Sequence, residues 1–309
     1  MNDKIEILSV SLLEQHRPTV RALKRLASSL GLEFGWHYLL DLTWMLSQLR
    51  SVKGKRIVDA GAGTGIMQWY LAEQGAEVIS VDRTSRAKLP LYFRNRYHVR
   101  GLRPQDLIPG AQLMRDSWSS PSRLRREIKP QARNLTAMAD PRRAAGRVVV
   151  YNQDLHDLGE LADASIDAVV AVSALEHNPP EHLPRVVSEL LRVLKPGGML
   201  LATLGTARDA DWLHVASQGW CYTEASLRRL FDLPAGTPAN YDDYDALFDA
   251  LKRCTELREN LASFYYRSGD NGMPWGQWDP QYMPVGVCKV KSDDGWQTTD
   301  NSRPTTNDK

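Results

Sequence analysis

The sequence predicts a single α/β domain built on a mostly parallel, doubly wound sheet. An apolar run at 57–58 leads through a glycine-rich turn into a helix, and a second apolar run follows at 78–81. Further apolar runs occur at 148–150, 166–172 and 199–204, and polar residues follow several of them. Repeated strand, turn and helix units give parallel sheets, and the polar residues fall where such sheets hold their ligands.

The glycine-rich turn is Asp59-Ala60-Gly61-Ala62-Gly63-Thr64-Gly65. Glycines let the backbone turn sharply and approach a ligand without Cβ atoms in between. The next strand ends at Asp82, 17 residues beyond Gly65, where a carboxylate can accept hydrogen bonds from ribose hydroxyls. We therefore predict a site for an adenosine-bearing cofactor, with Asp82 on its ribose.

The glycine spacing disfavours NAD. A dinucleotide-binding turn has the pattern G-x-G-x-x-G, so that a pyrophosphate can rest on the helix N-terminus. Here the pattern is Gly61-x-Gly63-x-Gly65, and position 66 is Ile. Taken alone, such a turn would also fit a plain strand-to-helix corner.

Three further blocks follow the turn at 59–65, namely 152–155, 166–177 and 194–204. In this order the four blocks resemble the class I S-adenosylmethionine-dependent methyltransferases, and within them the type 11 branch. The resemblance covers about 56–231. It implies a Rossmann-like sheet whose last strand runs antiparallel, and S-adenosylmethionine as the cofactor.

The resemblance also implies roles for single residues. Asp59 and the three glycines of the turn would form the loop beside the methionine part of the cofactor. Asp154 would accept from the adenine amino group, with a surface turn carboxylate as its alternative role, and Leu155 would pack on the ring. Ser173, at the end of the fourth predicted strand, is a further candidate contact to the cofactor.

His177 is a candidate general base. It follows the fourth predicted strand, and an imidazole titrates near neutral pH and can take a proton from a hydroxyl acceptor. The alternative is a histidine that orders the following turn, as is common in the type 11 enzymes. Methyl transfer also tolerates the lack of a base, because alignment and exclusion of water can supply most of the acceleration.

The first 50 residues are predicted to be a helical cap. Apolar residues recur there at intervals of three and four, as on amphipathic helices. In the resembling family such helices often fold over the cofactor and shape the acceptor pocket. Trp36, His37, Tyr38 and Asp41 are therefore candidate lid residues, with ordinary core and helix-surface positions as the alternative.

Residues 83–147 form a basic insertion after the second strand. They hold 16 Lys or Arg and four Asp or Glu, a net charge of +12 in a chain whose total is +2. Six prolines predict short, broken helices. The arginines could meet a polyanion, or they could pair with the acidic remainder on a solvated or oligomer-facing surface. We find no recognised RNA-binding motif, so sequence support for nucleic acid is thin.

The C-terminal third is predicted to contain a helix at 223–231 capped by Thr223, an amphipathic run at 244–266 and a final strand at 285–290. Between the last two lies an aromatic, turn-rich segment, 270–282, that could line the acceptor pocket or pin a loop to the core. Residues 292–309 are polar, and we expect a disordered tail. The expected division is thus a cap at 1–50, a methyltransferase domain at 51–291 and the tail.

Composition excludes other classes of protein. The chain has no run of about 18 apolar residues, and its N-terminus does not resemble a secretory signal, so we expect a cytoplasmic enzyme. Cys221, Cys254 and Cys288 are too few and too far apart for a disulfide framework or a zinc site, and no metal is expected. Oligomeric state is not specified.

These observations favour transfer of a methyl group from S-adenosylmethionine to a small hydroxyl-bearing molecule or a glycan intermediate. The type 11 resemblance and the aromatic C-terminal segment favour such an acceptor. An RNA methyltransferase that uses the 83–147 insertion is the alternative among enzymes. A non-catalytic, cofactor-binding partner subunit is the alternative outside catalysis.

Overall fold

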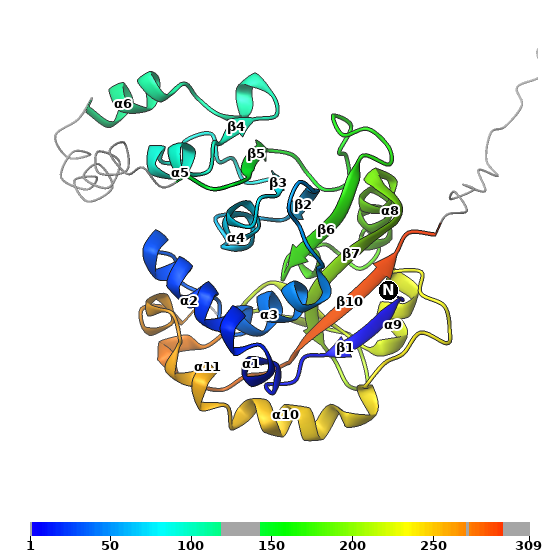
Figure 1. Cartoon of the computed structure of the whole chain (residues 1–309). Coiled ribbons are helices and arrows are strands. Elements are labelled where there is room, and N and C mark those ends of the chain that lie inside the picture. Colours follow the sequence, from blue (N-terminus) through cyan, green and yellow to red (C-terminus); the bar gives the residue numbers. More distant parts are fainter. Residues whose placement is uncertain (1, 119–142, 270–271, 293–309) are drawn as a thin grey trace, which may run out of the picture.

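The computed structural model describes residues 2–118, 143–269 and 272–292, which form a ten-stranded sheet covered by helices on both faces (Figure 1). The strands are, in chain order, β1 (Lys4–Ile7), β2 (Arg56–Ala60), β3 (Glu77–Val81), β4 (Arg100–Gly101), β5 (Arg147–Tyr151), β6 (Ile166–Val172), β7 (Leu194–Thr206), β8 (Trp212–His214), β9 (Gly219–Tyr222) and β10 (Pro284–Val290).

The sheet order is β1-β10-β7-β6-β2-β3-β5-β4, and β9 pairs with β7 and with β8 beside this path. Every pairing from β7 to β4 along the path is parallel. β10 runs antiparallel between β7 and β1. The predicted Rossmann-like fold, with an antiparallel last strand, is confirmed.

The helices connect these strands over both faces of the sheet. They are α1 (Leu12–Gln15), α2 (Arg17–Leu30), α3 (Tyr38–Gln48), α4 (Met67–Glu73), α5 (Leu91–Arg96), α6 (Gly110–Trp118), α8 (Leu183–Val193), α9 (Glu224–Leu230), α10 (Tyr244–Lys252) and α11 (Thr255–Glu259). No helix in the described ranges is both long enough and apolar enough to pass through a bilayer.

The central strands are apolar because both of their faces are covered. In β2, β3 and β5, four of the five residues are buried. Strands buried on both faces read as continuous apolar runs rather than as alternating ones. This is why these strands could be located in the sequence.

The N-terminal region differs from the all-helical cap that we expected. Residues Lys4–Ile7 form β1, which pairs with β10 at the edge of the sheet. The segment is only four residues long, and its partner lies some 280 residues away in the chain. Short strands with distant partners leave little local signal.

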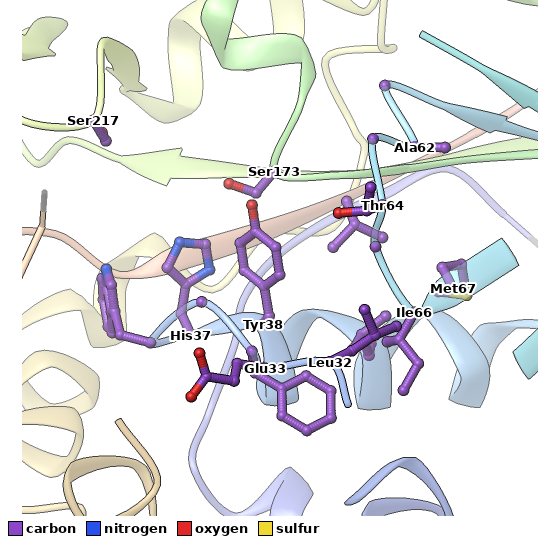
Figure 2. Close-up of a pocket in the computed structure, with 18 of the residues that line it drawn as sticks. Leu32, Glu33, His37, Tyr38, Ala62, Thr64, Ile66, Met67, Ser173 and Ser217 are labelled. Atoms are coloured by element: carbon purple, nitrogen blue, oxygen red, sulfur yellow. The ribbon is translucent and has the colours of Figure 1, made fainter. Parts of the chain in front are cut away.

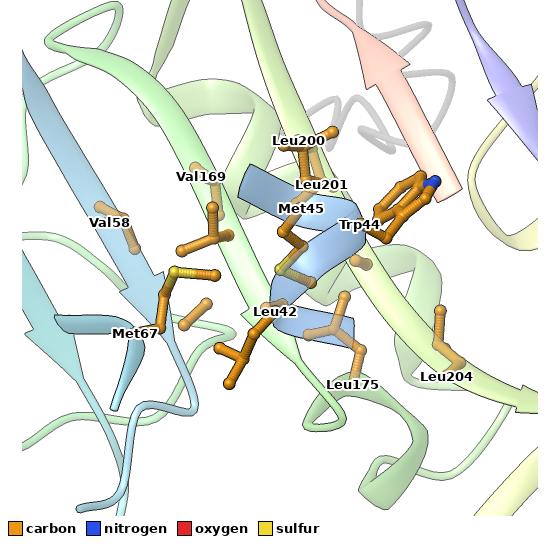
Figure 3. Close-up of a cluster of buried hydrophobic side chains, with 14 of the residues drawn as sticks. Leu42, Trp44, Met45, Val58, Met67, Val169, Leu175, Leu200, Leu201 and Leu204 are labelled. Atoms are coloured by element: carbon orange, nitrogen blue, oxygen red, sulfur yellow. The ribbon is translucent and has the colours of Figure 1, made fainter. Parts of the chain in front are cut away.

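Helix α3 packs the helical part of the N-terminal region against the sheet. Figure 3 shows Leu42, Trp44 and Met45 of this helix packed over apolar side chains of β2, β6 and β7. Trp44 is fully buried against Gly286 of β10, where an added Cβ would lie 2.4 Å from the indole Cζ2. The glycine therefore gives the tryptophan its place on the sheet.

The described parts of the basic insertion fold as short helices, as predicted, and add β4 to the edge of the sheet. The Arg94 guanidinium donates to the main-chain carbonyls of Leu89, Ile108 and Ala87 at 2.6–2.8 Å. Arg96 pairs with Glu73 of α4. These arginines hold the insertion together and tie it to the domain. Residues 119–142, which include several of the predicted arginines and prolines, lie outside the described residues.

The C-terminal predictions are largely confirmed. The Thr223 side chain accepts from the backbone N–H of Ser226 and caps α9, and β10 is the predicted final strand. The run at 244–266 is not one helix, because the extended backbone at Cys254 separates α10 from α11. The expected tail, 293–309, lies outside the described residues.

Candidate functional site

The turn between β2 and α4 has the geometry that its glycines predict. Gly61 and Gly63 have φ values of +73° and +46°, in the left-handed region that favours glycine. A Cβ on Gly61 would lie 2.4 Å from the Cβ of Ala174, in the segment that follows β6. The backbone N–H groups of Gly61 and Ala62 both donate to the Val81 carbonyl, which fixes the turn beside the end of β3.

Asp82 shapes this turn. Its Oδ2 accepts from the backbone N–H of Gly63 at 2.8 Å, and its Oδ1 accepts from that of Thr84 at 2.7 Å. A carboxylate oxygen has two lone pairs, so each oxygen retains one for a ligand. Asp82 therefore lies where the sequence predicts a ribose contact.

Asp59, at the end of β2, is buried with its Oδ2 lacking a hydrogen-bond partner in the described structure. Burial raises the pKa of Asp59 to about 7, against the opposing charge of Arg86. Arg86 lies under the turn, where its guanidinium donates to the Ser80 carbonyl at 2.6 Å. A buried carboxylate oxygen without a partner is suited to a cationic ligand group.

Two cavities meet at the turn. The smaller, of about 280 Å³, is lined by Asp82, Asp154 and Leu155. The larger, of about 590 Å³, extends from the turn to the C-terminal segment. Four residues line both cavities, namely Tyr38, Gly61, Ser173 and His177. The predicted ribose and adenine residues thus share one cavity, and the predicted methionine loop opens into both.

Asp154 is half exposed, and its Oδ1 accepts from the backbone N–H of His156 and pairs with the imidazole of the same residue. Leu155 beside it is nearly buried. An acidic group next to an apolar side chain is the combination predicted for the adenine end, and its role there stays a prediction.

Ser173 ends β6 in the left-handed region, with φ +46°. Its hydroxyl donates to Glu176 Oε1 at 2.5 Å, and the Tyr38 hydroxyl points at it from α3 (Figure 2). A non-glycine residue held in this region is strained, and such strain clusters at functional sites. Ser173 therefore lies at the junction of the two cavities, where the cap meets the sheet.

His177 is exposed, and its Nδ1 lies 3.0 Å from the Gln218 carbonyl on the β8–β9 hairpin. This contact holds the turn after β6 against the hairpin, which supports the turn-ordering role. The ring also lines both cavities. Its role as a base stays a prediction.

The sequence did not single out Glu176. Its Oε2 is buried without a partner in the described ranges, and burial raises the pKa of this carboxyl against the opposing influence of His177 and Ser173. It lines the larger cavity. The only signal for it in the sequence was its position beside His177 after the fourth strand.

A second unpredicted feature is a buried pair on α3. His37 Nδ1 lies 2.7 Å from Asp41 Oδ2, and His37 lines the larger cavity. Both residues were expected only as lid candidates. Their spacing of four residues, which places two side chains on one helix face, was the available signal.

The aromatic segment before β10 contributes less to the site than expected. Gly272 and Tyr282 line the larger cavity, but Trp275 is 70% exposed and lines neither cavity. The Trp278 indole donates to the Lys252 carbonyl at 2.8 Å and has a role in packing. Residues 270–271 lie outside the described residues.

Comparison with known protein families identifies the domain. A family model described as "Methyltransferase domain", the type 11 model, matches residues 125–202. That stretch includes β5, β6, the segment with Ser173 and Glu176, and α8. The segments that follow the matched strands line part of both cavities, and the glycine turn after β2 lines them too. These features support a class I S-adenosylmethionine-dependent methyltransferase.

Solved structures with a similar fold include three whose sequences are 15% identical to this chain. The 1,6-didemethyltoxoflavin-N1-methyltransferase of Burkholderia thailandensis, solved with S-adenosylhomocysteine, covers 88% of this chain and 77% of its own, with a TM-score of 0.39. The [4+2]-cyclase SpnF covers 94% and 99%, with a TM-score of 0.47. A phosphoethanolamine N-methyltransferase of Haemonchus contortus covers 91% and 59%, with a TM-score of 0.47.

No curated protein matches this methyltransferase. The identification therefore rests on the domain match together with the strand order and the turn.

The residues of the methyltransferase suit its cofactor, S-adenosylmethionine. At Gly63 the space that a Cβ would fill is nearly open, because only Asp82 Oδ2 lies near it, at 3.8 Å. The unpartnered oxygen of Asp59 suits an ammonium group, and the remaining lone pairs of Asp82 suit hydroxyls.

Proposed function

We propose that this methyltransferase O-methylates a small hydroxyl-bearing molecule or a glycan intermediate. The cofactor's methionine portion would lie on the 61–65 turn beside Asp59. Its ribose would bind Asp82, and its adenine would lie between Asp154 and Leu155, with Ser173 at the junction. The acceptor would occupy the larger cavity.

The larger cavity is the observation that supports this proposal. Its volume, about 590 Å³, is typical of sites for small ligands. Its walls combine aromatic and other apolar side chains with glycines and several polar groups, and such aromatic rings and polar groups can hold rings or sugars and fix their hydroxyls. The aromatic lining residues are Phe34, Trp36, Tyr38, Phe264, Tyr265 and Tyr282, and the titratable ones include His37, Glu176 and His177.

The bound cofactor supplies a methyl group activated by its sulfonium. The residues of this chain would bind and orient the acceptor and keep water out. The N-terminal segment 31–38 and the C-terminal residues Phe264, Tyr265, Gly272 and Tyr282 line the cavity. The backbone N–H of Trp36 donates to the Tyr265 hydroxyl at 3.0 Å and joins the two segments. Alignment in such an enclosure can supply most of the acceleration.

The cofactor half of the proposal can be tested by calorimetry with S-adenosylhomocysteine. Asp82→Ala should weaken binding by about 10- to 100-fold, because a hydrogen bond to a charged group contributes roughly 1.5–3 kcal/mol. Asp82→Asn, which keeps the side-chain volume, controls for collapse of the turn. Asp249→Ala removes an exposed carboxylate on α10, away from both cavities, and should bind normally. Wild-type affinity in both Asp82 variants would remove the ribose role.

The acceptor half needs a transfer assay. S-adenosylmethionine labelled in its methyl group is incubated with fractionated cell extract, and the labelled product is isolated and analysed. We expect a methyl ether in a small molecule or glycan fraction. Label in an amine, or label confined to RNA, would contradict the proposed acceptor class.

An RNA acceptor is less well supported. Arg94, Arg96 and Arg103 of the insertion are engaged by internal carbonyls or carboxylates. An RNA acceptor would bind through phosphates, and its affinity would fall steeply with added salt. A non-catalytic partner subunit would bind S-adenosylhomocysteine but release no labelled product from any fraction.

A further inference from the structure

His37 and Asp41 form a buried pair at the start of α3. Their exposed fractions are 3% and 0%. His37 Nδ1 lies 2.7 Å from Asp41 Oδ2, whereas Asp41 Oδ1 has no partner within the described structure. An ionised Asp41 carboxylate can only accept, so with Asp41 ionised Nδ1 carries the proton of a neutral His37 ring. The lone pair of that ring is then on Nε2.

The Nε2 atom of His37 is the ring nitrogen that Asp41 does not contact, and His37 lines the larger cavity. Its nearest recorded partner is the Tyr282 hydroxyl at 3.3 Å, which is longer than a well-formed hydrogen bond. Both residues line the cavity, and Figure 2 shows His37 beside Tyr38 on its wall. An acceptor hydroxyl could therefore approach Nε2 without displacing a strong bond.

Aromatic rings and ionisable side chains surround His37. Aromatic rings pack around it, those of Trp36, Tyr38 and Tyr282 lying with centroids 4.6–5.7 Å away. The charged or titratable groups that face it are Asp41 and Tyr38 on α3, Glu176 after β6, His214 on β8 and Tyr282 before β10. The two carboxyls can stabilise an imidazolium, and His214 opposes it.

We propose that His37 is the general base of the reaction and that Asp41 is the residue that positions it. The inference rests on the proposed O-methylation. The acceptor hydroxyl gives its proton to His37 Nε2, and its oxygen uses a lone pair to form the bond to the methyl carbon. The bond from that carbon to sulfur breaks, and its electron pair stays on sulfur. Asp41 balances the imidazolium until the proton leaves to solvent.

His177 is the rival base, and the contacts favour His37. A catalytic histidine is usually oriented by a third group, most often a carboxylate on its other nitrogen. Asp41 fills that position for His37. His177 instead has a backbone carbonyl at its Nδ1 and lies exposed at the cavity rim.

The tautomer can be read by NMR without any acceptor. The chain has seven histidines, and Nδ and Nε shifts of ¹⁵N-histidine-labelled enzyme bound to S-adenosylhomocysteine report the state of each ring. His37→Asn assigns the signal. We expect the neutral form of the His37 ring to carry its proton on Nδ1, and a changed tautomer balance in Asp41→Asn. A ring protonated on Nε2, or one unaffected by Asp41→Asn, would overturn the proposal.

Kinetics test the chemistry with the extract fraction that wild type labels. His37→Asn should lower the transfer rate by about 10²–10⁴-fold, the usual contribution of a general base, with little change in S-adenosylhomocysteine affinity. Imidazole should restore part of the rate of His37→Ala. Asp41→Asn should shift the pH profile of the rate. His182→Asn is the matched control. It changes an exposed histidine at the N-terminus of α8, and its transfer rate and pH profile should equal those of wild type.

The two proposals fail differently. If wild type labels no hydroxyl acceptor, the proposed function fails whatever the NMR result. If wild type labels an acceptor and His37→Asn keeps its rate and pH profile, the base assignment fails and the function stands. A loss confined to His177→Asn would transfer the role to His177.

Discussion

The Asp59 carboxyl is buried at the end of β2, and its pKa is raised to about 7 from an ordinary value near 3.9. A raised pKa in the folded state means that the folded protein favours the protonated form. The corresponding stability is fully present below about pH 3.9 and is lost as the pH rises through 7. In the absence of cofactor, the ionised carboxylate therefore destabilises the fold at pH 8.

A cationic cofactor group should reverse this effect. If the ammonium of S-adenosylhomocysteine binds Asp59, it favours the ionised form, and affinity should rise about tenfold between pH 6 and pH 8. Asp59→Asn should remove that pH dependence, weaken binding at pH 8 and raise the free energy of unfolding of the cofactor-free protein. Calorimetry at three pH values and urea unfolding measure these quantities. Equal pH dependence in variant and wild type would exclude Asp59 as the binding group.

At the scale of elements, the packing of α3 on β10 positions the N-terminal cap on the sheet. The Trp44 ring occupies the space over Gly286, and an added Cβ there would meet it at 2.4 Å. Gly286→Ala should destabilise the protein by about 1–3 kcal/mol, as overpacking of a core does. The midpoint and slope of urea unfolding measure the loss.

Gly236→Ala is the matched control for that substitution. Its Cβ would meet no atom within 4 Å, and surface changes of this kind usually stay within about 0.5 kcal/mol. If both variants lost the same stability, the packing of Trp44 on β10 would not be the cause.

The elements also mark how far sequence reasoning could reach. The strands and the glycine turn were predictable, because continuous apolar runs and glycine spacing are local signals. Asp59, Asp82, Asp154 and Leu155 were located by their positions after those strands. The meeting of His37 with Tyr282 was not predictable, because it joins segments 245 residues apart. The same applies to β1, whose pairing with β10 depends on the complete sheet.

At the scale of the whole molecule, N-terminal and C-terminal residues of the described chain line the larger cavity together. Arg17 and Lys24 of α2 both pair with Glu256 of α11, and the Glu33 carboxylate accepts from the Ser263 backbone at 2.9 Å. Single exposed ion pairs contribute little to stability. Their shared arrangement nevertheless fixes which two segments face each other across the cavity.

Cofactor binding should therefore stabilise the fold and slow hydrogen exchange in the glycine turn and in the cap. S-adenosylhomocysteine at 100 times its Kd should stabilise the fold by about 2.7 kcal/mol. Hydrogen exchange should slow in the 61–65 turn, and also in 31–38, because Tyr38 lines both cavities. Asp82→Ala should lose most of this protection at the same ligand concentration. Protection limited to 61–65 and Asp82 would mean that the cap takes no part in binding.

The order of strands has a consequence for synthesis. In the described sheet β1 pairs with β10 alone, and β10 begins at Pro284. A ribosome must therefore translate β10 before residues 4–7 can pair with residues 285–288. During synthesis β1 therefore remains unpaired until β10 has been made, and its edge can meanwhile bind chaperones or another copy of the chain.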